Sequence, residues 1–130
     1  MGQNDPYCTV TVEGVTERTS TIDNGGANPV WNEGNGEMMD FFPVVPSVPL
    51  VLLQCFDEDA GSDDLIGDVK INRKQRPCDK AWEEEAWVTL QRNGKPRGEA
   101  QIKLQYDPEP PEPVRRGMRC TVLALSLIHI

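Results

Sequence analysis

The carboxylates gathered in one short segment are the side chains of this sequence best suited to chemistry. Five acidic residues fall within the eight positions of DEDAGSDD, the segment 57–64, which directly follows the most apolar stretch of the chain. Like charges packed on one loop repel each other and raise each other's pKa. A hard cation such as Ca²⁺, which takes about six to eight oxygen ligands, relieves that repulsion. The segment therefore indicates a calcium-binding loop, with an ordinary solvated acidic turn as the alternative.

Two other uses of these carboxylates fit the sequence poorly. An EF-hand loop that begins at Asp57 requires Gly at its sixth position and Glu at its twelfth, but these positions hold Ser62 and Asp68. A catalytic acid and base pair made by Asp57 and Asp59 has no accompanying nucleophile motif, cofactor motif or His–acid arrangement. We therefore expect a binding protein rather than an enzyme.

Length and charge narrow the class of protein further. The 130 residues make one domain, and 13 Lys and Arg against 21 Asp and Glu give a net charge of −8. Such a chain is repelled by nucleic-acid phosphates, so we expect no nucleic-acid partner. The start of the sequence is polar and no apolar run is long enough to cross a membrane, which predicts a soluble chain without a leader.

The cysteines predict a reducing environment. Cys8, Cys55, Cys78 and Cys120 lie far apart, without the paired spacing of a zinc site or the density of a disulfide-stapled domain. Cys8 and Cys55 stand within apolar runs, where cysteine usually acts as a small core residue. We therefore expect reduced thiols and a cytoplasmic protein.

Short strands must position the acidic loop. Apolar residues recur with period two in bursts separated by Gly, Asn, Asp and Pro, a pattern typical of strands and turns. The predicted strands are 7–12, 15–20, 38–42, 49–56, 66–71, 86–90 and 99–106. Their spacing predicts an all-β fold, an antiparallel sandwich. Only 79–85 is a candidate for a short helical turn, and it is a weak one.

The segment after Tyr106 changes character, because DPEPPEP favours an extended, solvated spacer. We expect a β domain over 1–107, a proline-rich linker over 108–117 and an apolar tail over 118–130. The tail could return to the sheet as a strand, begin a second domain, or end in a reading-frame remnant. Its periodicity does not separate a strand from a short helix.

Several fragments, taken in order over residues 3–106, make the sequence resemble the C2 domain family. Each is similar to a family motif, namely DPY at the end of the first calcium loop, NPxWNE, the third-loop pattern DxD followed by DxIG, and the closing strands. The matching fragments here are Asp5-Pro6-Tyr7, NPVWNE at 28–33, DED at 57–59 with DLIGD at 64–68, and WVTL at 87–90 with Gly94 and Gly98-Glu99.

The resemblance implies an eight-stranded antiparallel β-sandwich of two four-stranded sheets, whose loops at one end bind calcium and, through calcium, anionic phospholipid headgroups. Acidic loops repel an anionic membrane until bound divalent ions cancel their field, which makes them an electrostatic switch. The partner implied is therefore an anionic membrane, bound reversibly from the cytoplasm. A calcium-independent protein interaction module of the same fold is the alternative. The implied calcium ligands are the carboxylates of Asp5, Asp57, Asp59 and Asp64, with the backbone carbonyl of Glu58 as a further donor.

The sequence departs from the family pattern at three places. Another Asp of the family's first calcium loop would lie about six residues before Asp5, ahead of the first residue of this sequence. The third loop is one residue short, which leaves Asp63 or Asp64 for its last ligand; the register of Leu65-Ile66-Gly67 favours Asp64. The tip at 60–62, Ala-Gly-Ser, has no bulky apolar or basic side chain, so we expect modest and mostly electrostatic membrane affinity.

The remaining motifs are assigned structural roles. The family's opening strand is absent, and the segment 118–127 resembles it, so that a return of the tail would cover the vacant edge. Trp31 is expected to be buried as an anchor for its turn. The methionines and phenylalanines within 38–42 are expected in the core. The basic cluster of Lys70, Arg73, Lys74 and Arg76 is interpreted as a solvated loop rather than a lipid site.

Overall fold

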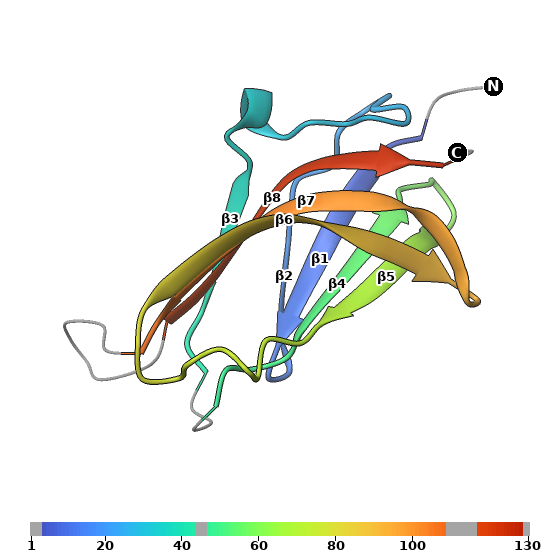
Figure 1. Ribbon diagram of the computed structural model, residues 1–130. Helices are drawn as coiled ribbons and strands as arrows, with labels where there is room; N and C mark the ends of the chain where they lie inside the picture. The colour runs from blue at the N-terminus through green and yellow to red at the C-terminus, as the bar shows by residue number, and fades with distance from the viewer. Residues whose placement is uncertain (1–3, 44–46, 109–116, 129–130) are drawn as a thin grey trace.

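The eight strands of the protein follow the predicted order along the chain. The structure is a computed structural model that describes residues 4–43, 47–108 and 117–128 (Figure 1). Apart from one turn of 3-10 helix, Asn32–Gly34, its regular elements are strands. They are β1 (Pro6–Val12), β2 (Val15–Arg18), β3 (Glu37–Phe41), β4 (Val51–Asp57), β5 (Asp64–Ile71), β6 (Trp82–Arg92), β7 (Lys95–Asp107) and β8 (Gly117–Leu127). The all-β prediction is confirmed.

The strands form one antiparallel sheet that folds into two layers. Its order is β2-β1-β4-β5-β6-β7-β8-β3, and β5 meets β6 at a single paired position, Asp68 with Gln91. The sheet bends at this sparse junction, so that β1, β2, β4 and β5 lie behind β3, β6, β7 and β8 in Figure 1. Buried side chains of both layers, such as Leu53 and Leu104, belong to one hydrophobic cluster. The antiparallel eight-stranded sandwich implied by the resemblance is therefore confirmed, although its two four-stranded layers are joined through β5 and β6 into one sheet.

The C-terminal segment completes the front layer. β8 pairs with β7 from Gly98–Leu127 to Asp107–Gly117 and with β3 from Glu37–Val122 to Phe41–Met118. Of the alternatives left open by the sequence, the structure shows the tail as a strand within the sheet. The pairing of β8 with β7 also covers an edge of β7 that would otherwise expose unpaired backbone groups. Most of the predicted linker, 109–116, lies outside the described residues.

The core contains the side chains expected from the alternation of the strands. In β4, Val51, Leu53 and Cys55 are buried while the residues between them are half-buried, as expected for a strand covered fully on one face and partly on the other. Trp31 is only 1% exposed, and its indole Nε1 donates a hydrogen bond to the carbonyl of Ser20 at 3.0 Å. The anchoring role predicted for Trp31 agrees with this burial.

The core also encloses the two cysteines that were expected to be core residues. Cys8 and Cys55 are opposite each other in the β1–β4 pairing, both fully buried, with their Sγ atoms 2.8 Å apart. Burial raises the pKa of the Cys8 thiol, and the neighbouring Cys55 raises it further. Burial likewise raises the pKa of Cys120 to about 12. All four cysteines are free thiols, and these two pKa directions favour the protonated, unreactive form.

Two local predictions were wrong. The candidate helical turn at 79–85 is not helical, because β6 already begins at Trp82 and pairs there with Tyr106. The long hairpin with β7 gives these residues backbone partners that a two-turn helix could not match. The core assignment within 38–42 fails for Met38 and Phe42, which are 63% and 55% exposed. Alternation along a strand sends neighbours to opposite faces, so only Met39 and Phe41 of this group are buried.

Candidate functional site

The start of β1 and the end of β4 bring together two of the predicted ligands. The backbone N–H of Asp5 donates a hydrogen bond to Oδ1 of Asp57 at 2.8 Å, across a separation of 52 residues. In return, the N–H of Glu58 donates to the backbone carbonyl of Asp5 at 2.9 Å. These bonds extend the β1–β4 pairing, in which Pro6 lies opposite Asp57. The aspartate of the DPY motif therefore contacts the acidic loop directly.

A third predicted ligand stands on the other side of β4. Asp64 opens β5 and is the pairing partner of Asp57 in the antiparallel register. Like charges directly opposite each other destabilise a strand pair. Asp57 thus has one acidic neighbour in sequence position 5 and another in sequence position 64, all at the same end of the sandwich. Such crowding favours a bound cation at this end.

The fourth predicted ligand lies in the loop that joins these strands. Asp59 is exposed, and its Oδ1 accepts a hydrogen bond from the N–H of Ala60 at 2.7 Å. Its own N–H donates to Oδ1 of Asp63 at 3.2 Å. Oδ2 of Asp63 in turn accepts a hydrogen bond from the hydroxyl of Tyr7 at 2.5 Å. Both oxygens of Asp63 are therefore used within the protein, whereas the carboxylate of Asp64 accepts no hydrogen bond among the residues that the structure describes.

The contact between Tyr7 and Asp63 shifts the pKa of both groups. The Tyr7 hydroxyl, and next the N–H of Asp59, lower the pKa of the Asp63 carboxyl from its usual value. Burial, and then the hydrogen bond to Asp63, raise the pKa of Tyr7. The ionised carboxylate and the neutral phenol are thus the favoured pair at neutral pH. The contribution of this hydrogen bond to folding stability is present at pH values above the pKa of an unfolded aspartate. It is lost as the pH falls through the lowered pKa of Asp63 in the folded state.

Replacing Tyr7 by Phe is expected to raise the pKa of Asp63 towards its usual value, because the largest cause of the lowering is removed. The Phe ring keeps the shape that stacks on Phe56, 5.2 Å between ring centroids. Carboxyl titration of Asp63 by NMR measures the shift. Tyr106→Phe is the matched control, since the Tyr106 hydroxyl donates to the carbonyl of Cys78. An unchanged Asp63 pKa in Tyr7→Phe would contradict this account of the loop.

Arg18 is a residue of this end that the sequence interpretation missed. Its guanidinium lies 3.7 Å from the centroid of the Tyr7 ring and 3.5 Å from Oε2 of Glu58. Glu58 also accepts a hydrogen bond from the hydroxyl of Thr21 at 2.9 Å. The β1–β2 register places Arg18 opposite Thr9, so counting back from the Glu13-Gly14 turn could have indicated its position. Arg18 compensates part of the negative charge and links β2 to the acidic loop.

The chemistry of the carboxylates fits a hard divalent cation. Asp5 and Asp57 each use Oδ1 to accept a backbone N–H, from Asn24 at 2.6 Å and from Asp5 at 2.8 Å. Within the described part of the chain, their Oδ2 atoms accept no hydrogen bond. Oxygen donors of this kind are the ligands that calcium prefers. Over the same described residues, however, no group of three His, Cys, Asp or Glu side chains is drawn together at metal-binding spacing.

Comparison with known proteins identifies the family of the chain. A family model, the C2 domain, matches residues 1–90 of the chain. The chain belongs to the C2 domain family. The resemblance recognised from the sequence is therefore confirmed.

Two curated relatives of this C2 domain are plant proteins. Synaptotagmin-4 of Arabidopsis thaliana is 30% identical over 118 residues, which cover 83% of this chain and 20% of the relative. The 16 kDa phloem protein 1 of Cucurbita maxima is 34% identical over 71 residues, covering 54% of this chain and 47% of the relative. The chain thus spans about a fifth and about half of the lengths of these relatives. Across the residues with described structure, no helix is long and apolar enough to cross a membrane.

The opposite end of this C2 domain holds the basic cluster noted in the sequence. Arg73 makes a bidentate contact with Glu84, with Nη2 to Oε2 at 2.8 Å, and lowers the pKa of that carboxyl. The guanidinium of Arg76 lies 4.3 Å from the centroid of the Trp82 ring. Two of the four cations therefore have local partners, while Lys70 and Lys74 are exposed. This pattern agrees with the interpretation of the cluster as a solvated loop.

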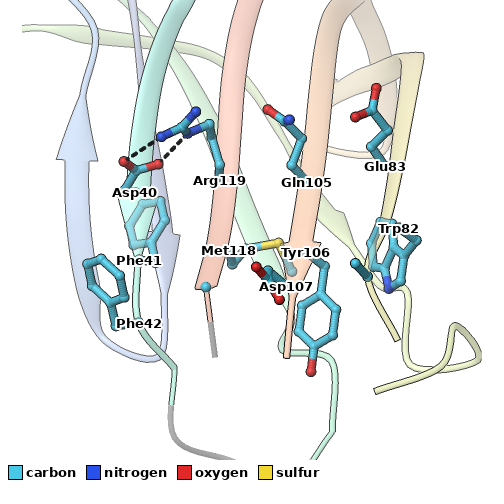
Figure 2. Close-up of a pocket in the computed structure, with 12 residues that line it drawn as sticks. Asp40, Phe41, Phe42, Trp82, Glu83, Gln105, Tyr106, Asp107, Met118 and Arg119 are labelled. Carbon is cyan, nitrogen blue, oxygen red and sulfur yellow. Dashed lines mark hydrogen bonds and ion pairs between the residues drawn. The ribbon is translucent and has the colours of Figure 1, made fainter. Parts of the chain in front are cut away.

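A hollow of about 590 Å³ also lies away from the acidic end, on the front layer. Figure 2 shows it between the end of β3 and the start of β6, with Asp40 paired to Arg119 at 2.6 Å. Trp82 stacks on Tyr106 at its other side, 5.7 Å between ring centroids. The hollow lies at the other end of the strands from Asp57 and Asp64, so it is separate from the candidate metal site.

Proposed function

We propose that this C2 domain binds anionic phospholipid membranes reversibly and in response to calcium. The observation that carries the proposal is the contact of Asp5 with Asp57, because it joins the DPY motif to the acidic loop across 52 residues of sequence. Asp64, the strand partner of Asp57, adds a further carboxylate on the same end. An acidic turn made only of residues 57–64 would lack this additional acidic residue from the start of β1.

The proposed calcium ligands come from three strand ends and one loop. Asp5 and Asp57 each have one carboxylate oxygen without a hydrogen bond in the described structure. Neither carboxylate oxygen of Asp64 accepts a hydrogen bond there. Asp59 adds a carboxylate from the exposed loop, and the carbonyl of Glu58 is the further donor. Bound calcium supplies positive charge and coordination positions for phosphate oxygens. Without it, the carboxylates repel an anionic surface.

The shape of the loop limits how the domain would hold a membrane. Residues Ala60, Gly61 and Ser62 at its tip are exposed and small, so they offer little apolar area to the bilayer. Binding therefore depends on charge and weakens with added salt. We propose that the protein resides in the cytoplasm and moves to the membrane surface when calcium rises.

Vesicle co-sedimentation tests the proposed function. The chain is expected to bind vesicles of phosphatidylserine and phosphatidylcholine much more tightly in millimolar calcium than in EDTA. We expect a calcium Kd on the order of 10⁻⁵ to 10⁻³ M, by analogy with exposed sites of low ligand count. At 1 mM calcium and a Kd near 10⁻⁴ M, ligand binding to the folded state stabilises it by about 1.4 kcal/mol. A chain whose melting temperature and vesicle binding both ignore millimolar calcium would refute the proposal.

A calcium-independent protein interaction module is the second candidate, and the outer face of β3 favours it. Met38 and Phe42 project there with 63% and 55% of their surface exposed. β3 is also an edge strand of the sheet among the described elements, so its backbone can pair with another chain. Calorimetric titration of the chain with calcium separates the candidates, since only the first predicts a saturable binding isotherm with calcium.

A further inference from the structure

The hairpin between β6 and β7 brings three cationic residues close together on two paired strands. Asn93 and Gly94 form its two-residue turn, both with positive φ, 55° and 76°. Such a turn matches the twist of the flanking strands and gives a rigid connection. It sets Arg92 directly opposite Lys95. Like charges at opposed positions cost stability, so this pair is a feature that folding alone does not favour.

A bulge adds the third cation. Leu90 pairs with Gly98 and Gln91 with Pro96, so Arg97 has no partner residue on β6. A bulge re-aims the side chain of its extra residue. Nε of Arg97 is buried and has no hydrogen-bond partner in the described structure. Arg92, Lys95 and Arg97, with Asn93, line a hollow of about 260 Å³.

None of the three cations has an acidic partner among the described residues. Of these three side chains, Arg92 has a hydrogen bond to the rest of the described structure, because its Nη1 donates to the carbonyl of Leu65 at 2.8 Å. The chain has a net charge of −8 and many carboxylates, yet the charged residues that line this hollow are all cationic. The missing counter-charge favours an anion from outside the protein.

The hairpin stands at the same end of the sandwich as the candidate metal site. Leu65, which accepts the Arg92 hydrogen bond, directly follows Asp64. Figure 1 shows the β6–β7 turn and the loop between β4 and β5 on the same side of the molecule. A membrane that approaches the acidic loop therefore also faces the cationic hollow.

We propose that Arg92, Lys95 and Arg97 form a phosphate-binding site that receives the phosphate of an anionic lipid headgroup, or a free phosphate, without calcium. Guanidinium groups bind phosphate oxygens in a bidentate manner, and an ammonium adds a point charge. The placement of this site against a membrane rests on the proposed function, whereas its affinity for phosphate does not. The site would orient the domain by adding a fixed contact beside the calcium-dependent one.

The test compares two charge-matched double variants of the full chain. Lys95→Gln with Arg97→Gln removes two cations from the hollow and keeps Arg92, which holds Leu65. Lys70→Gln with Lys74→Gln removes two exposed cations at the opposite end. Binding to phosphatidylserine vesicles is measured in EDTA and in calcium. The hairpin variant is expected to bind about tenfold more weakly than the control variant in EDTA. Equal losses in the two variants would show that only net charge matters and would overturn the proposal.

NMR titration distinguishes the sources of the phosphate. Shifts of the Asn93 and Gly94 amides with inorganic phosphate, absent in the hairpin variant, support free phosphate as a ligand. Shifts that occur only with short-chain phosphatidylserine support the headgroup. No hairpin shift with either probe overturns the site. Lys95→Gln alone, at an exposed position, repeats the test if the double variant melts early.

The same measurements separate this site from the calcium proposal. One outcome is that vesicle binding by the wild-type protein does not respond to calcium, while the hairpin variant binds vesicles more weakly than the control variant in EDTA. This outcome supports the phosphate site and refutes the calcium switch. The opposite outcome is that the hairpin variant keeps the full calcium response and binds vesicles in EDTA as well as the control variant does. This outcome overturns the phosphate site and leaves the calcium switch intact.

Discussion

Asp57→Asn combined with Asp59→Asn is expected to abolish calcium-dependent vesicle binding while the domain stays folded. The change removes two of the four proposed carboxylate ligands. The amide introduced at position 57 keeps an Oδ1 acceptor, so the hydrogen bond from the N–H of Asp5, 2.8 Å in the parent, can persist. Calcium prefers charged oxygen ligands, and the affinity of a site for calcium falls when charged ligands are removed. We expect no shift of melting temperature in the variant at calcium concentrations that stabilise the parent.

The stability of the calcium-free variant has a predicted sign. Asp57 faces Asp64 across the β4–β5 pairing, and removal of its charge relieves that repulsion. The variant should therefore be as stable as the parent in EDTA, or slightly more stable. Thermal melts with and without calcium measure both effects. Glu83→Gln with Glu85→Gln removes two charges from β6 and serves as the control. A control that loses the calcium response equally would contradict the assignment of the loop.

Trp31→Ala is expected to destabilise the domain by about 3–5 kcal/mol, the cost of removing a large buried aromatic side chain. Trp31 is 1% exposed, and its indole N–H satisfies the carbonyl of Ser20. Its backbone also accepts hydrogen bonds from Gly34 and Gly36 and donates one to Leu123. The substitution thus leaves a cavity and an unpaired carbonyl where the 28–36 loop joins the sheet.

Urea denaturation of Trp31→Ala and Trp87→Ala measures this effect against a matched control. Trp87 lies on β6 with 47% of its surface exposed, so its replacement should change the free energy of unfolding by less than about 1 kcal/mol. The same substitution is then compared at a buried, hydrogen-bonded tryptophan and at a half-exposed one. Similar losses at both positions would show that Trp31 does not anchor the core.

The sequence by itself determined the strands and the family. Period-two alternation located the predicted strands, because one face of each must be apolar to pack against the other layer. The Glu13-Gly14 pair and the DPY and NPVWNE motifs carry local conformational requirements that are visible in residue type alone. Burial of Trp31 and Leu53 followed from the same patterns. These features depend on neighbours in sequence, so one sequence is enough to predict them.

Only the tertiary structure decided which of these pieces meet. The hydrogen bond from Asp5 to Asp57 depends on strand register, and the place of β8 between β7 and β3 depends on which sheet edge is vacant. The β6 strand replaced the helical turn expected at 79–85 because a distant segment, β7, supplied its backbone partners. The bulge that frees Arg97 is equally a matter of register. Each of these outcomes is set by pairing between residues far apart in the chain, and local periodicity contains no information about such pairing.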